Sequence, residues 1–205
     1  MVLIAAALIG LPLLGRKYGI SRERSLARRL GFSFHPKAPP GFSRRLGGFS
    51  LLRGEGRSPV SRLMLRSEKG RNLAVFIIQH PRRRGARVPT TLRVFFADSA
   101  SLKLPYFRMA PESIPDYIQK IPDIDFDRHP AFSRRYLLQG ESAEKVRSVF
   151  TPPLLDYLAR RRLLRMEGWK NRLVVAHPRI EAQRLLKWGR AILEMLEESS
   201  KNRRV

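Results

Sequence analysis

Apolar positions recur with the period of a strand through the middle of the chain. The segment SRLMLRS at 61–67 alternates Leu63 and Leu65 with polar neighbours, which is typical of a half-buried strand. The run NLAVFIIQH at 72–80 is continuously apolar, as in a central strand, and TTLRVFFAD at 90–98 completes an antiparallel set. The intervening PRRRGARVP predicts an exposed basic turn.

The rest of the chain alternates strand and helix signals. Further strands are expected at 104–113, which enters a helix near Ser113, and at 132–140, 163–168 and 172–177, with a weaker one at 49–53. Helices are expected at 21–31, at 141–150 with Ser142 as cap, from Thr151 and Pro152 onward, and at 179–198. In the last helix Leu185 and Trp188 fall on the apolar face, so we expect both to be buried against the strands.

These elements predict the α+β class, with an antiparallel sheet of hairpins, flanking helices and a preceding N-terminal membrane helix. We expect a membrane anchor with its basic flank at 1–20, a single domain at 21–198 and a frayed tail at 199–205.

The membrane prediction rests on the N-terminus. Met1 to Gly15 carry no charge, and basic residues follow at once. Fifteen helical residues span only about 22 Å, less than the roughly 30 Å of the hydrocarbon core, so snorkelling by Arg16 and Lys17 would have to narrow the gap. A buried helix and a signal peptide are the alternatives. The positive-inside rule would place the domain in the bacterial cytoplasm, behind a single pass through the inner membrane.

Charge is the outlier in the composition. The net charge is +24, and the first 110 residues hold 22 basic and only 4 acidic side chains. Such a field attracts anionic lipid or nucleic acid. Arginine outnumbers lysine 32 to 9, so a bias of composition is an equal explanation.

Catalytic signatures are sparse. The chain has no cysteine, no phosphate-binding loop and no histidine pair at helical spacing. We therefore expect no enzyme activity, no cofactor and no metal. The alternative is a metal-dependent enzyme that uses the segment DIDFDRH. Its ligands would be Asp123, Asp125, Asp127 and His129, although Arg128 and Arg134 break the pattern of a calcium loop.

The motifs LPYFRMAPES, DIDFDRHPAFSRRYLLQGES, VRSVFTPPLLDYL and RMEGWKNRLVVAHP lie within residues 104–177. In these motifs the chain resembles a family of uncharacterised bacterial membrane-anchored proteins. The resemblance implies a membrane anchor followed by an α+β domain, and it implies no catalytic residue.

The expected role is a membrane-tethered basic scaffold or interaction domain at the inner leaflet, and the expected partner is an anionic membrane surface. A tethered nucleic-acid-binding module is the alternative. The residues expected to contact anionic lipid are Arg16, Lys17, Arg22, Arg24, Arg28 and Arg29. A second basic group could hold phosphates, with a solvated turn as the alternative; it comprises Arg82, Arg83, Arg84 and Arg87.

Overall fold

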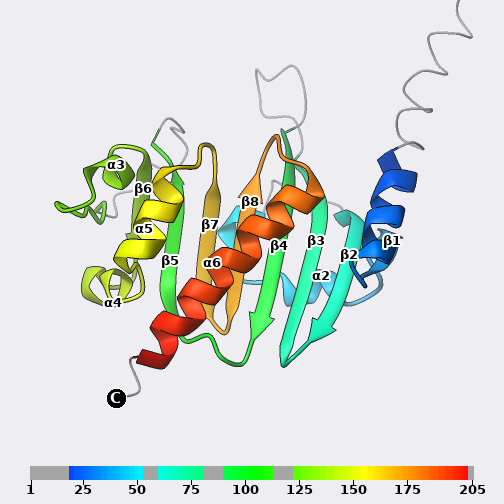
Figure 1. Cartoon of the computed structure of the whole chain (residues 1–205), viewed down its shortest axis with the longest axis horizontal. Helices are drawn as coiled ribbons and strands as arrows, with labels where there is room; N and C mark the ends of the chain where they lie inside the picture. The colour runs from blue at the N-terminus through cyan, green and yellow to red at the C-terminus, as the bar shows by residue number, and fades with distance from the viewer. Residues whose placement is uncertain (1–18, 53–59, 81–89, 113–121, 203–205) are drawn as a thin grey trace, which may run out of the picture.

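The computed structural model describes residues 19–52, 60–80, 90–112 and 122–202 (Figure 1). Their centre is one antiparallel sheet of eight strands in the order β1-β2-β3-β4-β8-β7-β5-β6. The strands are β1 Ser33–Lys37, β2 Val60–Glu68, β3 Arg71–His80, β4 Thr90–Ser99, β5 Leu104–Pro111, β6 Tyr136–Gly140, β7 Arg165–Lys170 and β8 Arg172–His177. The last hairpin of the chain, β7–β8, therefore lies between β4 and β5 in the middle of the sheet.

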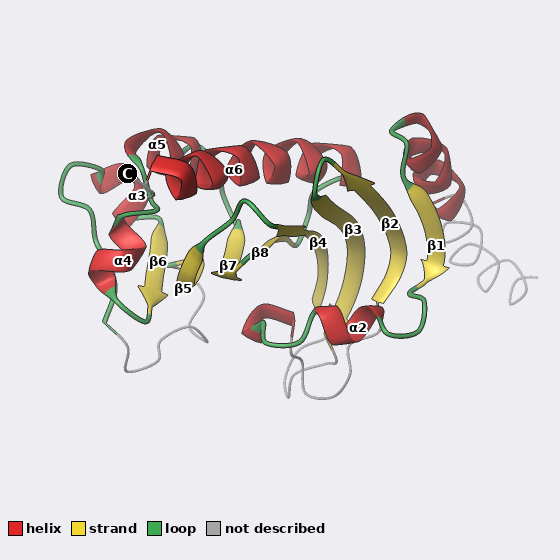
Figure 2. Cartoon of the chain, turned by 90° about the horizontal axis from the view of Figure 1, so that it is seen from below, coloured by secondary structure: helices red, strands yellow, loops and turns green. Residues whose placement is uncertain are grey.

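Helices cover both faces of this sheet and make a three-layer domain (Figure 2). One face carries α6 (Ala182–Asn202) and α5 (Pro152–Ala159), with α3 (Pro130–Ser133) and α4 (Ala143–Arg147) beside β6. A further helix over residues 19–29, here called the N-terminal helix, lies beside β1. The opposite face carries the short helix α2 (Phe42–Arg45) and the 3₁₀ turn η1 (Ser50–Leu52). The α+β class and the antiparallel sheet are thus confirmed.

Two apolar cores fill the spaces between these layers. On β4, Phe95 and Ala97 face the α6 side, whereas Val94 and Phe96 face the α2 side. Because β3 and β8 alternate in the same way, a continuously apolar strand is buried on both faces, as the run at 72–80 predicted.

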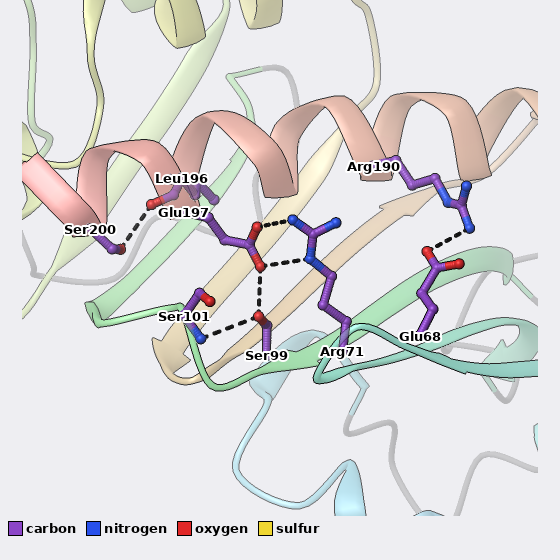
Figure 3. A network of polar contacts seen from close by, with 8 residues as sticks. All are labelled: Glu68, Arg71, Ser99, Ser101, Arg190, Leu196, Glu197 and Ser200. Atoms are coloured by element: carbon purple, nitrogen blue, oxygen red, sulfur yellow. Dashed lines mark hydrogen bonds and ion pairs between the residues drawn. The ribbon is translucent and has the colours of Figure 1, made fainter.

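A polar network fixes α6 to the sheet (Figure 3). The buried carboxylate of Glu197 accepts hydrogen bonds from both Arg71 of β3 and Ser99 of β4. One turn further along, Ser200 Oγ donates to the carbonyl of Leu196 at 2.8 Å. The helix consequently continues to Asn202, and Ser199 and Ser200 are buried in it, where a frayed tail from residue 199 was expected.

Two further expectations were wrong. The segment Ser50–Leu52 forms η1 and no strand, because the carboxylate of Glu167 accepts the backbone N–H groups of Ser50 and Leu51. The strand expected from residue 132 begins at Tyr136, since Pro130 starts the helix α3 instead. The edge strand β1 was not predicted.

The expected membrane helix and the turn at residues 81–89 lie outside the described residues. Among the described helices, none is both long and apolar enough to cross a bilayer.

Candidate anion-binding site at the N-terminal helix

The N-terminal helix packs one stripe of residues against the sheet. Glu23, Leu26 and Ala27 are buried, and Gly31 ends the helix with a φ of 70°. The N–H of Phe32 donates to the carbonyl of Ala27 at 2.8 Å, and the N–H of Gly31 donates to that of Arg28 at 3.2 Å. These two bonds form a Schellman motif, which confirms Gly31 as the helix end.

The arginines of this helix lie on two flanks of the buried stripe. Arg22 and Arg29 are seven residues apart and share one flank, whereas Arg24 and Arg28 are four apart and share the other. Arg24 lies over the ring of Phe34, with its guanidinium carbon 5.7 Å from the ring centroid. The two flanks therefore meet different surroundings, although they carry the same charge.

A polar cavity of about 480 Å³ opens on the flank of Arg22 and Arg29. Its walls come from the N-terminal helix, β2, β4 and the start of α6. The lining residues are Gly19, Arg22, Glu23, Ser25, Leu26, Arg29, Arg62, Arg93, Glu181, Ala182 and Gln183. The described lining residues thus include four arginines and two glutamates, an excess of two positive charges.

The inner wall is organised around the carboxylate of Glu23. Its Oε1 accepts a hydrogen bond of 2.6 Å from Arg93 Nη1, and Arg93 Nε donates to the carbonyl of Ile180 at 2.9 Å. Because both bonds fix its guanidinium, Arg93 is a rigid part of the wall. The second oxygen, Glu23 Oε2, is buried and has no hydrogen-bond partner among the described residues. Buried carboxylate oxygens normally accept at least one hydrogen bond, so this atom is an available acceptor.

Arg62 reaches the cavity from a distorted part of β2. Its backbone φ of 52° lies in the left-handed region, which residues other than glycine rarely adopt. The pairing of β2 with β3 shifts register at the same place, between Ser61 and Met64. The bulge turns Arg62 toward the helix. Its Nη1 is 3.8 Å from Glu23 Oε1, close enough for an ion pair but too far for a hydrogen bond.

Gly19 leaves room for the guanidinium of Arg62. A Cβ at residue 19 would lie 2.8 Å from Arg62 Nη1, so any larger residue would displace that group. At the rim, Arg22 pairs with Glu181 at 3.2 Å, but both side chains are more than two-thirds exposed, so this pair contributes little to stability.

The structure distributes the expected contact residues unevenly. Arg22 and Arg29 line the cavity, whereas Arg24 and Arg28 lie on the other flank. The remaining ones lie outside the described residues, namely Arg16, Lys17, Arg82, Arg83, Arg84 and Arg87. Sequence reasoning missed Glu23, Arg62 and Arg93. The available signal was Glu23 itself, because it is one of only four acidic residues among the first 110.

The acidic segment considered for metal binding is engaged in structural contacts. Asp123 Oδ1 accepts the backbone N–H groups of Ile124 and Leu138, each at 2.8 Å. His129 Nδ1 lies 3.1 Å from Asp156 Oδ1. No group of three or more metal-ligating side chains forms within the described part of the chain.

An open cavity of about 630 Å³ adjoins this segment, lined by Asp125, Asp127, His129 and neighbouring residues. The described lining residues include no hydroxyl or thiol that could act as a nucleophile beside His129. This cavity therefore offers less defined chemistry than the one at the N-terminal helix.

The fold and the cavity together define an α+β domain with a basic pocket. Its architecture is similar to the crystal structure of the mycobacterial trehalose monomycolate transport factor A, TtfA, with a TM-score of 0.62 and 13% identity, over 88% of this chain and 93% of that one. At this identity the similarity concerns the fold alone. No family model matches the chain, and no curated protein matches it, which is consistent with an uncharacterised family.

Proposed function

We propose that this chain is a basic, non-enzymatic interaction domain tethered to the inner leaflet of a bacterial membrane by residues 1–15. The observation that carries the proposal is the arginine-rich cavity on the N-terminal helix. Gly19 at its edge lies only four residues after Gly15, where the uncharged run ends.

The distance along the chain supports this arrangement. Four residues span at most ~14 Å, and the headgroup region is about 5–8 Å thick on each side of the hydrocarbon core. If the apolar run ends at the edge of that core, Gly19 and the edge of the cavity beside it lie within reach of lipid headgroups. Each arginine near an anionic surface contributes about 1 kcal/mol of attraction. The structural neighbour is a transport factor, which is compatible with a non-catalytic role.

Fractionation tests the tether. The full-length chain and a chain lacking residues 1–15 would each be expressed with a tag, and the membranes would be washed in carbonate. We expect the full-length chain to stay in the membrane pellet and the shortened chain to be released. Recovery of the full-length chain in the soluble fraction would refute the tether.

A binding comparison tests the partner. The chain without residues 1–15 would be sedimented with anionic vesicles and with neutral vesicles, and it would be titrated with duplex and single-stranded nucleic acid at physiological salt. We expect binding to the anionic vesicles only. Tighter, sequence-selective binding to nucleic acid would replace this proposal with that of a tethered nucleic-acid-binding module.

A further inference from the structure

We propose that the cavity at the N-terminal helix is a specific site for a phosphate ester that carries a hydroxyl group. In this site the guanidinium groups of Arg62 and Arg29 bind the phosphate, and the hydroxyl donates to Glu23 Oε2. The inference rests on the proposed function only for the source of the ligand, which is either a lipid headgroup or a free polyol phosphate.

The charge of the cavity favours an anion. Arg93 is matched by Glu23 through a short hydrogen bond, and Arg22 is matched by Glu181 at the rim. Among the described lining residues this leaves Arg29, and Arg62, whose ion pair with Glu23 is long at 3.8 Å. Guanidinium groups bind phosphate oxygens with paired hydrogen bonds, which gives geometric selectivity as well as charge attraction.

The buried oxygen of Glu23 requires a donor. Glu23 is 8% exposed, and no described residue donates a hydrogen bond to its Oε2. A simple anion without a hydroxyl, such as sulfate, would leave this carboxylate oxygen unsatisfied and would be repelled by it. An ammonium donor would meet Arg62 and Arg93 beside the same carboxylate. A neutral hydroxyl satisfies Glu23 Oε2 without placing a third positive charge there.

The backbone of β2 supports a binding role for Arg62. The backbone of Arg62 is held at a φ of 52°, which has a conformational cost for a residue with a side chain. Strained residues of this kind cluster at ligand sites. The register shift that produces this conformation turns the guanidinium toward Gly19 and the cavity, where its closest carboxylate oxygen is beyond hydrogen-bond distance. No carboxylate of the described residues therefore takes a hydrogen bond from Arg62.

The first experiment measures ligand chemistry with the full-length protein in a nonionic detergent. Calorimetric titrations would compare glycerol 3-phosphate with methyl phosphate, which has the same charge and no hydroxyl, and with phosphoethanolamine, whose donor is an ammonium. We expect saturable binding of glycerol 3-phosphate roughly tenfold or more tighter than that of the other two, the ratio typical of one hydrogen bond to a charged group. Equal binding of all three would refute the role of Glu23.

Adjacent arginines provide a matched pair of variants. Arg29→Gln and Arg28→Gln remove the same charge from neighbouring exposed positions, but only Arg29 lines the cavity. We expect Arg29→Gln to weaken glycerol 3-phosphate binding at least about fivefold and Arg28→Gln to leave it unchanged, with equal melting temperatures. Equal effects of the two variants would mean that the attraction is general and would refute the site.

Gly19→Ala provides a second variant with an intact charge. Its methyl group would displace the guanidinium of Arg62, which is the far end of a long side chain and can move at little cost. We expect weaker binding of glycerol 3-phosphate with an unchanged melting temperature. Unchanged binding would show that Arg62 does not contact the ligand.

Vesicles distinguish the two sources of the ligand. The full-length protein would be diluted from detergent to below the critical micelle concentration and mixed with vesicles of phosphatidylglycerol or of phosphatidylmethanol, which carry equal charge. A preference for phosphatidylglycerol that is lost in Arg29→Gln would identify a lipid headgroup. Equal vesicle binding combined with selective binding of glycerol 3-phosphate would identify a free ester. If the protein bound both kinds of vesicle equally and bound no soluble phosphate ester, this inference would be refuted and the proposed function would still stand.

Discussion

Glu197 on α6 and Arg71 on β3 form a two-point ion pair, in which Arg71 Nε donates to Oε1 at 3.0 Å and Nη2 donates to Oε2. Ser99 of β4 adds a third hydrogen bond, of 2.6 Å, to Oε1 (Figure 3). The side chain of Glu197 is only 4% exposed. One carboxylate on the helix thus satisfies polar groups from two neighbouring strands.

Glu197→Ala should lower the free energy of unfolding by about 3 kcal/mol, because it leaves a partly buried guanidinium without its partner. Urea denaturation would measure the loss. The control is Glu181→Ala, which removes an exposed partner of Arg22 and should cost no more than about 0.5 kcal/mol. Equal losses in the two variants would contradict a special role for the buried pair.

Gly189→Ala should destabilise the protein although it improves helix propensity. An added Cβ would lie 2.3 Å from Cγ of Phe95, so α6 would have to move away from β4. In an exposed helix this change would stabilise by about 1 kcal/mol, whereas overpacking typically costs about 1–3 kcal/mol. Thermal melting would show whether the substitution raises or lowers the stability of the protein. The double variant with Phe95→Leu should recover part of the loss, and strict additivity would argue against the contact.

Leu185→Ala should lower the free energy of unfolding by about 2–5 kcal/mol, because the side chain is fully buried between α6 and the sheet. Lys187→Ala, an exposed position two residues away, is the control. A Leu185→Ala variant that melts like the parent would mean that the last helix adds no stability to the domain.

His177 should make the protein less stable in mild acid. Burial lowers the pKa of its imidazole below the ordinary 6.5, although a hydrogen bond with the backbone of Arg162 opposes this shift. Its Nδ1 accepts the N–H of Arg179 at 2.9 Å, which requires the unprotonated nitrogen. The unfolded chain therefore takes up a proton near pH 6.5 while the folded protein resists it.

Stability should consequently fall as the pH drops below about 6.5 and should stop falling on this account once the pH passes below the folded pKa. Melting temperatures between pH 7.5 and pH 5 would show the trend. His177→Gln should be less stable than the parent at pH 7.5 and should show a shallower decline. A parallel decline in both proteins would assign the acid sensitivity to other groups.

The strands with strong periodicity were predictable from sequence. β2, β3 and β4 each begin and end within one or two residues of the expected positions, because their alternating or continuous apolar runs match burial on one face or both. β1 was missed because SFHPK contains Pro36 and a lysine and lies at the sheet edge, where pairing with β2 alone imposes no such pattern. η1 depends on Glu167, more than a hundred residues away, which no local pattern could reveal.

Only some of the residues that line the cavity could be predicted from the sequence. Arg22 and Arg29 were selected for their charge and their closeness to the apolar run. Glu23 and Arg93 are 70 residues apart and meet only because the N-terminal helix packs beside β2 and β4. An isolated arginine in a strand has no sequence signature of its own, so the contribution of Arg62 depended on the bulge that turns it inward.

The position of the β7–β8 hairpin has a consequence for synthesis of the chain. Strands β1 to β4 form one half of the sheet and β5 with β6 the other, but the hairpin that joins them spans Arg165 to His177. The ribosome makes the protein from the N-terminus, so β4 and β5 cannot pair with the hairpin until more than four-fifths of the chain has been translated. Until then each half of the sheet has an unpaired edge strand. Pairing over such long sequence separations is slow and leaves strand edges exposed to aggregation. A nascent chain that stalls before residue 165 would therefore carry two unpaired edges and depend on chaperones.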